Sequence, residues 1–276
     1  MTVRGGSALV TGAAAVVVRD VQGPEEMHAC EQLYADVMGL RAGDGSINPR
    51  LLIALQHNGG YVIGAFLAGK AVGFAYSFLG CDRLGAGIND LYQYSQLAVV
   101  AQGMQGEGIG KRLKLAQRDR CLADGLHRIK WAYDPLQTRN GHFNLNVLGA
   151  HVVGFTPAMY GGSGFGTYTG DATDRFIVDW SLDADSPTTG RPVPTCTWRV
   201  GSYVEDRDDL LIAVPARWDR FRAEAGTETA ATVRDQLRDA FTQVLDTGRV
   251  GVSCQAVDQD AAVYRFTHLA QQADLP

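Results

Sequence analysis

The sequence lacks any long apolar run. No segment of the 276 residues approaches the roughly 20 apolar residues that a membrane-spanning helix requires, so we expect no spanning segment. Residues 8–18 form an apolar Ala/Val/Gly stretch that imitates the core of a secretory signal, but Arg4 alone gives it a thin charged flank. The favoured interpretation is a tail over residues 1–14 that leads into a first strand.

Cysteine is sparse and shows no pairing pattern. The five cysteines are odd in number and widely separated, with no C-x-x-C pair, so neither a disulfide framework nor a zinc ribbon is indicated. His57 and His151 also lack a paired metal-ligand spacing, and we expect no metal site. The cysteines are typical of small core residues in a reducing compartment, which predicts a cytoplasmic protein.

The chain also lacks an excess of positive charge. It carries 25 Lys and Arg against 30 Asp and Glu, a net charge of -5, which argues against sequence-independent binding of nucleic acid. With 46% hydrophobic and 9% aromatic residues it has the composition of a globular protein. Neither nucleic acid nor a membrane is an expected partner, and a homodimer stays open.

Hydrophobic periodicity predicts an α/β or α+β domain with a mixed sheet. In its first part the expected helices are 24–39, 48–56, 108–123 and 140–148, and the expected strands are a first one after the tail, 61–67, 71–79, 91–100, 128–133, 152–155 and 176–180. In helix 108–123 we expect Ile109 and Leu113 to face inward and Lys111, Lys114 and Arg118 to face largely outward.

A Pro- and Gly-containing segment divides the chain. Residues 183–195 read as a linker between a first domain, 15–182, and an extension, 196–276. The extension is expected to contain strands 196–204, 210–214, 250–257 and 262–266 and a helix, 229–246. About 80 residues bury too little surface for secure independent stability, so we expect the extension to pack on the first domain or on a partner.

The most informative stretch is L-A-V-V-A-Q-G-M-Q-G-E-G-I-G-K-R-L, residues 97–113. It reads as an apolar strand, a loop with four glycines and a basic helix. Unpaired backbone N–H groups at the start of a helix, together with the helix dipole, form an anion site that glycines leave open to a phosphate. The five basic residues between 111 and 120 favour a ligand with several phosphates.

The glycine spacing fits neither G-x-x-x-x-G-K-[ST] nor G-x-G-x-x-G. It does fit Q-x-x-G-x-G, through Gln105, Gly108 and Gly110. With the preceding strand and the following segment W-A-Y-D-P-L-Q-T-R-N-G-H-F-N-L-N-V-L-G-A (131–150), the chain resembles the GNAT superfamily of acyl-CoA-dependent N-acyltransferases, and within it a bacterial subgroup with a long C-terminal extension. The alternative is a tight turn whose glycines only allow close packing.

The resemblance implies a three-layer α+β fold: a mixed, mostly antiparallel sheet with helices on both faces, plus a smaller α+β extension. It also implies acetyl-CoA or another short acyl-CoA as co-substrate. The expected contacts are the amides of 105–111 on the pyrophosphate, the backbone of 97–99 on the pantetheine arm and two amide side chains beside it: Leu97, Ala98, Val99, Gln105, Gly106, Gly108, Ile109, Gly110, Lys111, Asn140 and Asn144. For the two asparagines, helix capping or a solvated amide is an equal alternative.

The reaction needs a base for the acceptor amine and can use an acid for the departing thiolate. The candidate bases are Asp90, Asp134 and His142. Many relatives carry a tyrosine as acid on the helix after the fifth strand, but Leu145 or Val147 falls there, so Tyr160 or His142 is the candidate acid. For each, a structural or solvent-exposed role is the alternative.

The sequence says less about the acceptor. Arg139 could pair with a carboxylate on an amino-acid acceptor or on a dicarboxylic acyl chain, or could be a plain surface residue. Residues 160–170 read as a flap or a simple hairpin. The predicted function is transfer of an acetyl or other short acyl group, succinyl included, to a small amine or amino acid. The alternatives are a non-catalytic acyl-CoA-binding protein and a protein-lysine acyltransferase.

Overall fold

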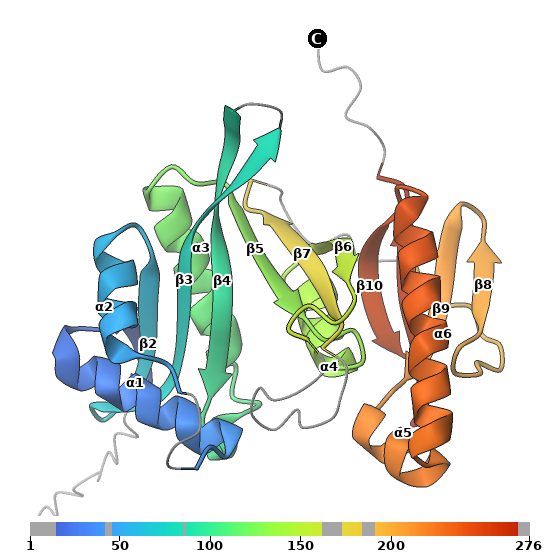
Figure 1. The fold of residues 1–276 in the computed structure, drawn as a ribbon, viewed down its shortest axis with the longest axis horizontal. Coiled ribbons are helices and arrows are strands. Elements are labelled where there is room, and N and C mark those ends of the chain that lie inside the picture. Colours follow the sequence, from blue (N-terminus) through green and yellow to red (C-terminus); the bar gives the residue numbers. More distant parts are fainter. Residues whose placement is uncertain (1–14, 42–45, 85–86, 162–172, 184–190, 270–276) are drawn as a thin grey trace, which may run out of the picture.

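The computed structural model describes residues 15–41, 46–84, 87–161, 173–183 and 191–269. In this part of the chain eleven strands form one continuous sheet in the order β1-β2-β3-β4-β5-β7-β6-β10-β11-β9-β8 (Figure 1). Every pairing is antiparallel except that of β4 with β5. The predicted mixed, mostly antiparallel α+β fold is therefore confirmed.

The strands are β1 (Val17–Asp20), β2 (Tyr61–Leu67), β3 (Lys70–Leu84), β4 (Gly87–Val100), β5 (Arg128–Tyr133), β6 (His151–Thr156), β7 (Arg175–Ser181), β8 (Tyr203–Asp206), β9 (Asp209–Pro215), β10 (Val250–Ala256) and β11 (Ala261–Thr267). The helices are α1 (Gly23–Met38), α2 (Pro49–His57), α3 (Ile109–Ala123), α4 (Thr138–His142), α5 (Trp218–Ala225) and α6 (Thr227–Asp246), with a 3-10 turn η1 (Gln102–Met104) and a π-helical turn η2 (Phe143–Val147).

Helices cover both faces of the first part of the sheet. Alternate residues of β2 point to opposite sides, so Val62 and Phe66 pack with the core beneath α1 and α2, whereas Ile63 and Ala65 pack with the core beneath α3. Figure 1 shows α1 crossing in front of the strands and α3 behind them.

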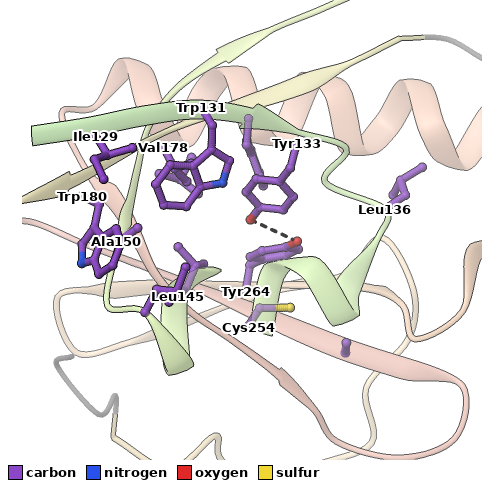
Figure 2. Close-up of a cluster of buried hydrophobic side chains, with 14 of the residues drawn as sticks. Ile129, Trp131, Tyr133, Leu136, Leu145, Ala150, Val178, Trp180, Cys254 and Tyr264 are labelled. Carbon is purple, nitrogen blue, oxygen red and sulfur yellow. Dashed lines mark hydrogen bonds between the residues drawn. The ribbon is translucent and has the colours of Figure 1, made fainter. Parts of the chain in front are cut away.

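The extension continues the same sheet. Strand β10 meets β6 at the pair Gly251 and Val152, where a Cβ on Gly251 would lie 2.9 Å from the Cβ of Val152. Glycine therefore permits the close approach of the two strands. In Figure 2 Tyr264 of β11 faces Tyr133 of β5, with the hydroxyl oxygens 3.4 Å apart, and the Tyr264 hydroxyl donates to the carbonyl of Pro135 at 2.9 Å.

Most predicted elements are present, and the exceptions lie near or in the extension. The prediction of a strand over 196–204 is wrong, because only residues 203 and 204 belong to a strand, β8. Before them the chain turns: Trp198 donates its indole N–H to the carbonyl of Pro194, and Gly201 has a φ of 82°. The short helix α5 was not predicted. The helix expected over 140–148 starts at Thr138 and widens into the π-helical turn η2.

Candidate functional site

Strands β4 and β5 separate soon after they meet. Their parallel pairing covers only Gln93 with Ile129 and Tyr94 with Lys130. A register shift against β3 accompanies the separation, since Ser77 pairs with Ser95 but the preceding residue of β3 pairs with Leu97. Among the described residues, 95–100 pair with β3 on one side and with no strand on the other, and Figure 1 shows β5 diverging from β4. The result is an unpaired strand edge.

The glycine-rich turn lies at the end of this edge. Gly106 and Gly108 adopt φ of 90° and 75°, and a Cβ on Gly106, Gly108 or Gly110 would meet no atom within 4 Å. Outside the helices and strands of the described part of the chain, no backbone hydrogen bond is donated by residues 105–111. Ile109 and Leu113 pack in the core and so fix the position of the first turn of α3. The turn therefore presents a group of unpaired amides to open space.

The residues predicted to bind an acyl-CoA lie on these two features. Leu97, Ala98 and Val99 lie on the unpaired edge of β4, and 105–111 make up the turn and the first residues of α3. The side chain of Gln105 turns back, with Nε2 donating to the carbonyl of Val100 at 3.3 Å. It thus joins the turn to the strand.

Lys114 is buried, which corrects the prediction that it faces outward. Its side chain is 5% exposed, and its Nζ donates to the Ser95 hydroxyl at 2.8 Å and lies 3.9 Å from the centroid of the Trp131 ring. No carboxylate of the described residues forms an ion pair with it or perturbs its pKa. Burial lowers the pKa of Lys114 to about 7, because the apolar surroundings penalise the charged amine.

Other polar side chains gather beneath the same point of the sheet. The Ser95 hydroxyl donates to Gln117 Oε1 at 3.0 Å. Within the described part of the chain, Ser77 Oγ, Gln93 Oε1 and Gln117 Nε2 are buried without a hydrogen-bond partner. Such atoms are rare in folded proteins and mark a place where water or a ligand atom completes the bonding.

Tyrosines occupy the opposite face of the sheet at this point. Tyr94, the last β4 residue paired with β5, has a buried hydroxyl and lies near Tyr160; burial, and then Tyr160, raise the pKa of Tyr94 to about 12. Tyr160 is 37% exposed, and the Arg175 guanidinium lies 5.3 Å from its ring centroid. The candidate acid Tyr160 therefore does come close to the separating strands. Most of the predicted 160–170 flap lies outside the described residues.

The candidate base Asp90 lies away from the point where β4 and β5 separate. It precedes the β4–β5 pairing and forms an ion pair with Arg128, which also contacts Asp82 and Asp179. Lys130 joins the same network through Asp82 at 2.6 Å. The Asp90 carboxylate is thus engaged by a guanidinium on the far side of the pairing from the glycine-rich turn.

Asp134 follows β5 and borders a cavity of about 320 Å³ against the extension. Its Oδ1 accepts the N–H of Leu136 at 2.9 Å, and burial raises the pKa of this carboxyl. The charged residues that line the cavity are Asp134, Asp174, Asp219, Arg222, Arg234 and Arg238. Arg238 pairs with Asp174 at 3.1 Å. Helices α5 and α6 of the extension thus bring guanidinium groups to the end of β5.

The remaining candidates lie on or beside α4. Asn140 is exposed and borders the same cavity, whereas Asn144 is 4% exposed. Arg139 and His142 line a separate groove against the extension, where His142 Nδ1 lies 3.1 Å from the carbonyl oxygen of Cys254. Of the two positions where the sequence resemblance would place a tyrosine acid, Leu145 is a core residue 1% exposed and Val147 is partly exposed.

Two negative findings hold for the described part of the chain only. It contains no group of three or more His, Cys, Asp or Glu side chains arranged to hold a metal ion. None of its helices is both long and apolar enough to cross a membrane.

Sequence reasoning missed Lys114, Ser95 and Gln117. A signal was present, because Lys114, Gln117 and Cys121 follow one another at intervals of three and four, the spacing of one helix face. Cys121 and Gln117 are fully buried, so the buried face of α3 that includes Cys121 also includes a lysine and a glutamine.

No family model and no curated protein matches the chain. Among solved structures it is similar to a candidate acetyltransferase of Salmonella typhimurium with its cofactor acetyl-CoA (18% identity, TM-score 0.49, 66% of this chain and 100% of that one). A second is a ribosomal-protein-alanine N-acetyltransferase from Brucella melitensis (17% identity, TM-score 0.47, 60% of this chain and 99% of that one). A third is a GNAT-family acetyltransferase from Streptococcus pneumoniae (14% identity, TM-score 0.46, 60% of this chain and 99% of that one). At these identities and TM-scores no function is transferred from them.

Proposed function

We propose that the protein is an acyl-CoA-dependent N-acyltransferase that moves an acetyl or other short acyl group to a small amine or amino acid. The observation that carries the proposal is a juxtaposition at one end of β4. An unpaired strand edge, 95–100, runs directly into a turn whose amides, 105–111, have no partner among the described residues. A diphosphate joined to an extended amide-containing arm is the ligand that complements both features.

The residues present fit coenzyme A. The amides of 105–111 would bind the diphosphate, because the open space at Gly106, Gly108 and Gly110 lets phosphate oxygens approach the backbone. The backbone of Leu97, Ala98 and Val99 would hold the pantetheine arm as an added strand. When bound, acyl-CoA supplies an activated thioester, and the protein has mainly to position the two substrates.

Asp134 is the candidate base of this chain. Its raised pKa and its place beside the cavity suit a carboxylate that accepts a proton from an ammonium group. Three aspartates and three arginines line the cavity, and an amino-acid acceptor, which bears both an ammonium group and a carboxylate, would match this mixed charge. The extension would then form part of the acceptor site.

The test compares two glycines of the same helix. Gly108 begins α3 at φ 75° and Gly125 follows its end at φ 72°, and a Cβ on either would meet no atom within 4 Å. Gly108→Val and Gly125→Val therefore impose a similar backbone strain, of order 1–2 kcal/mol. Only Gly108→Val puts a side chain where the diphosphate would dock.

Calorimetric titration with CoA should show at least about tenfold weaker binding for G108V, with G125V close to wild type. Equal losses in both variants, or no loss in G108V folded by circular dichroism, contradict the proposed diphosphate site. Release of free thiol from acetyl-CoA or succinyl-CoA with a panel of amines then tests transfer. Tight binding of CoA without thiol release for any amine would favour the non-catalytic acyl-CoA-binding alternative.

A further inference from the structure

A lysine lies where β4 and β5 begin to separate. Ser95 and Trp131 are the first residues beyond the last pair, Tyr94 and Lys130, and the Nζ of Lys114 contacts both side chains. The amine of α3 therefore lies directly beneath the start of the unpaired edge. An arm that runs along β4 from the turn brings its far end to this point, about 17 Å from Val100 at 3.3 Å per residue.

Lys114 lacks the usual partners of a structural lysine. Buried lysines are normally paired with a carboxylate, since an unpaired buried charge is costly. Here the partners are a hydroxyl and an aromatic ring, and the neighbouring Gln117 Nε2 has no hydrogen-bond partner among the described residues. The face of the Trp131 ring partly stabilises the charged amine, but no carboxylate offsets the cost of burial, and this balance favours release of a proton.

We propose, on the basis of the function proposed above, that Lys114 donates a proton to the sulfur that leaves during acyl transfer. The nitrogen of the neutral acceptor amine, which has already given up its ammonium proton to water, forms a bond to the carbonyl carbon. The carbon–sulfur bond breaks with its electron pair on sulfur, and Lys114 gives its Nζ proton to that sulfur. The acceptor nitrogen loses its proton to the base, and Lys114 regains one from solvent. This assigns the acid role that Leu145 leaves vacant.

The groups that face Lys114 do not compete for this role. The titratable side chains of the described residues in the same core are Cys121 of α3, Tyr61 of β2, Tyr133 of β5, Cys254 of β10 and Tyr264 of β11. Burial raises the pKa of all five, those of Cys121 and Cys254 to about 12, so they stay neutral around pH 7. Strands β3 and β4 contribute Ser77 and Ser95 here. An amine that titrates near 7 is a stronger acid than a thiol with a pKa of about 8.5, so the transfer is downhill.

The first experiment needs neither acceptor nor acyl-CoA. The sequence contains four lysines, Lys70, Lys111, Lys114 and Lys130, so the side-chain methylene signals of labelled lysine can be followed by NMR from pH 5.5 to 10. The signal lost in K114M should titrate near pH 7. A Lys114 signal that stays protonated to pH 10 overturns the proposal, because such an amine is a weaker acid than the thiol.

The second experiment measures thiol release from acetyl-CoA and succinyl-CoA with alkylamines, polyamines and the standard amino acids. On the fastest pair, kcat of the wild type should fall above about pH 7. Lys114→Met should lower kcat by about 100-fold, leave KM for the acyl-CoA within threefold and abolish that alkaline fall. Ser95→Ala keeps the amine but removes the hydroxyl that accepts its hydrogen bond. This variant should lower kcat less than Lys114→Met does and should shift the pH at which kcat falls.

The outcomes separate this inference from the function on which it rests. A folded K114M with wild-type kcat and pH profile overturns the role of Lys114 and leaves the acyltransferase proposal standing. If K114M does not fold, an S95A variant whose pH profile of kcat matches that of the wild type likewise overturns the role of Lys114. A wild-type protein that releases no thiol with any pair overturns both.

Discussion

Replacing Lys114 by methionine should stabilise the folded protein near neutral pH. Lysine in an unfolded chain has a pKa of about 10.4, whereas burial lowers that of Lys114 to about 7. Between these values the unfolded state holds a proton that the folded state has released. The free energy of unfolding of the wild type therefore rises with pH, by about 1.4 kcal/mol per pH unit from this one group.

K114M lacks this contribution, so its advantage over the wild type should shrink by about 2–3 kcal/mol between pH 7.5 and 9.5. Urea denaturation followed by tryptophan fluorescence at both pH values measures the change. Lys111→Met is the matched control, since Lys111 is exposed on the same helix and keeps its contact with water. The difference in free energy of unfolding between K114M and the wild type could instead stay constant to within about 0.5 kcal/mol, as it should for the control. That result would refute the reasoning that burial lowers the pKa of this amine.

Three further predictions concern the base and the contact with the extension. Asp134→Asn should lower kcat by about 100-fold in the thiol-release assay, whereas Asp90→Asn, which alters only the Arg128 network, should change it less than threefold; equal effects contradict the assignment. Gly141→Ala would put a Cβ 2.4 Å from the Tyr264 hydroxyl and should destabilise the protein by about 1–3 kcal/mol in urea. Adding Tyr264→Phe should recover part of that loss, and strictly additive effects would show that the two residues do not meet.

Much of the fold follows from local signals in the sequence. Two apolar, aromatic runs divided by a short turn predict the β2–β3 hairpin, and in this turn Ala68 and Gly69 both take positive φ. A proline at the start and Gly39 at the end delimit α1. The glycine-rich turn is also a local feature, since its strand, loop and helix are contiguous. Its open conformation therefore follows from residues 97–113 alone.

The parts that could not be predicted depend on residues far apart in the chain. Arg128 engages Asp90 only because β4 and β5 pair, and this contact removes Asp90 from the candidate site. The cavity beside Asp134 exists because α5 and α6, about 90 residues later, pack near the end of β5. The sequence of the basic helix alone predicts that Lys114 is exposed, and only the packing of α3 on β4 and β5 places Ser95 and Trp131 against its amine.

The most direct test of the account is an amide NMR titration of the protein with CoA. The unpaired amides at the start of α3 are predicted to bind the diphosphate, so the signals of residues 105–111 should move furthest and those of 97–99 should become protected from exchange with solvent. The same titration with G108V should leave these signals in place. Saturable shifts confined to another part of the molecule, such as the arginine-lined cavity beside α6, would contradict the central claim.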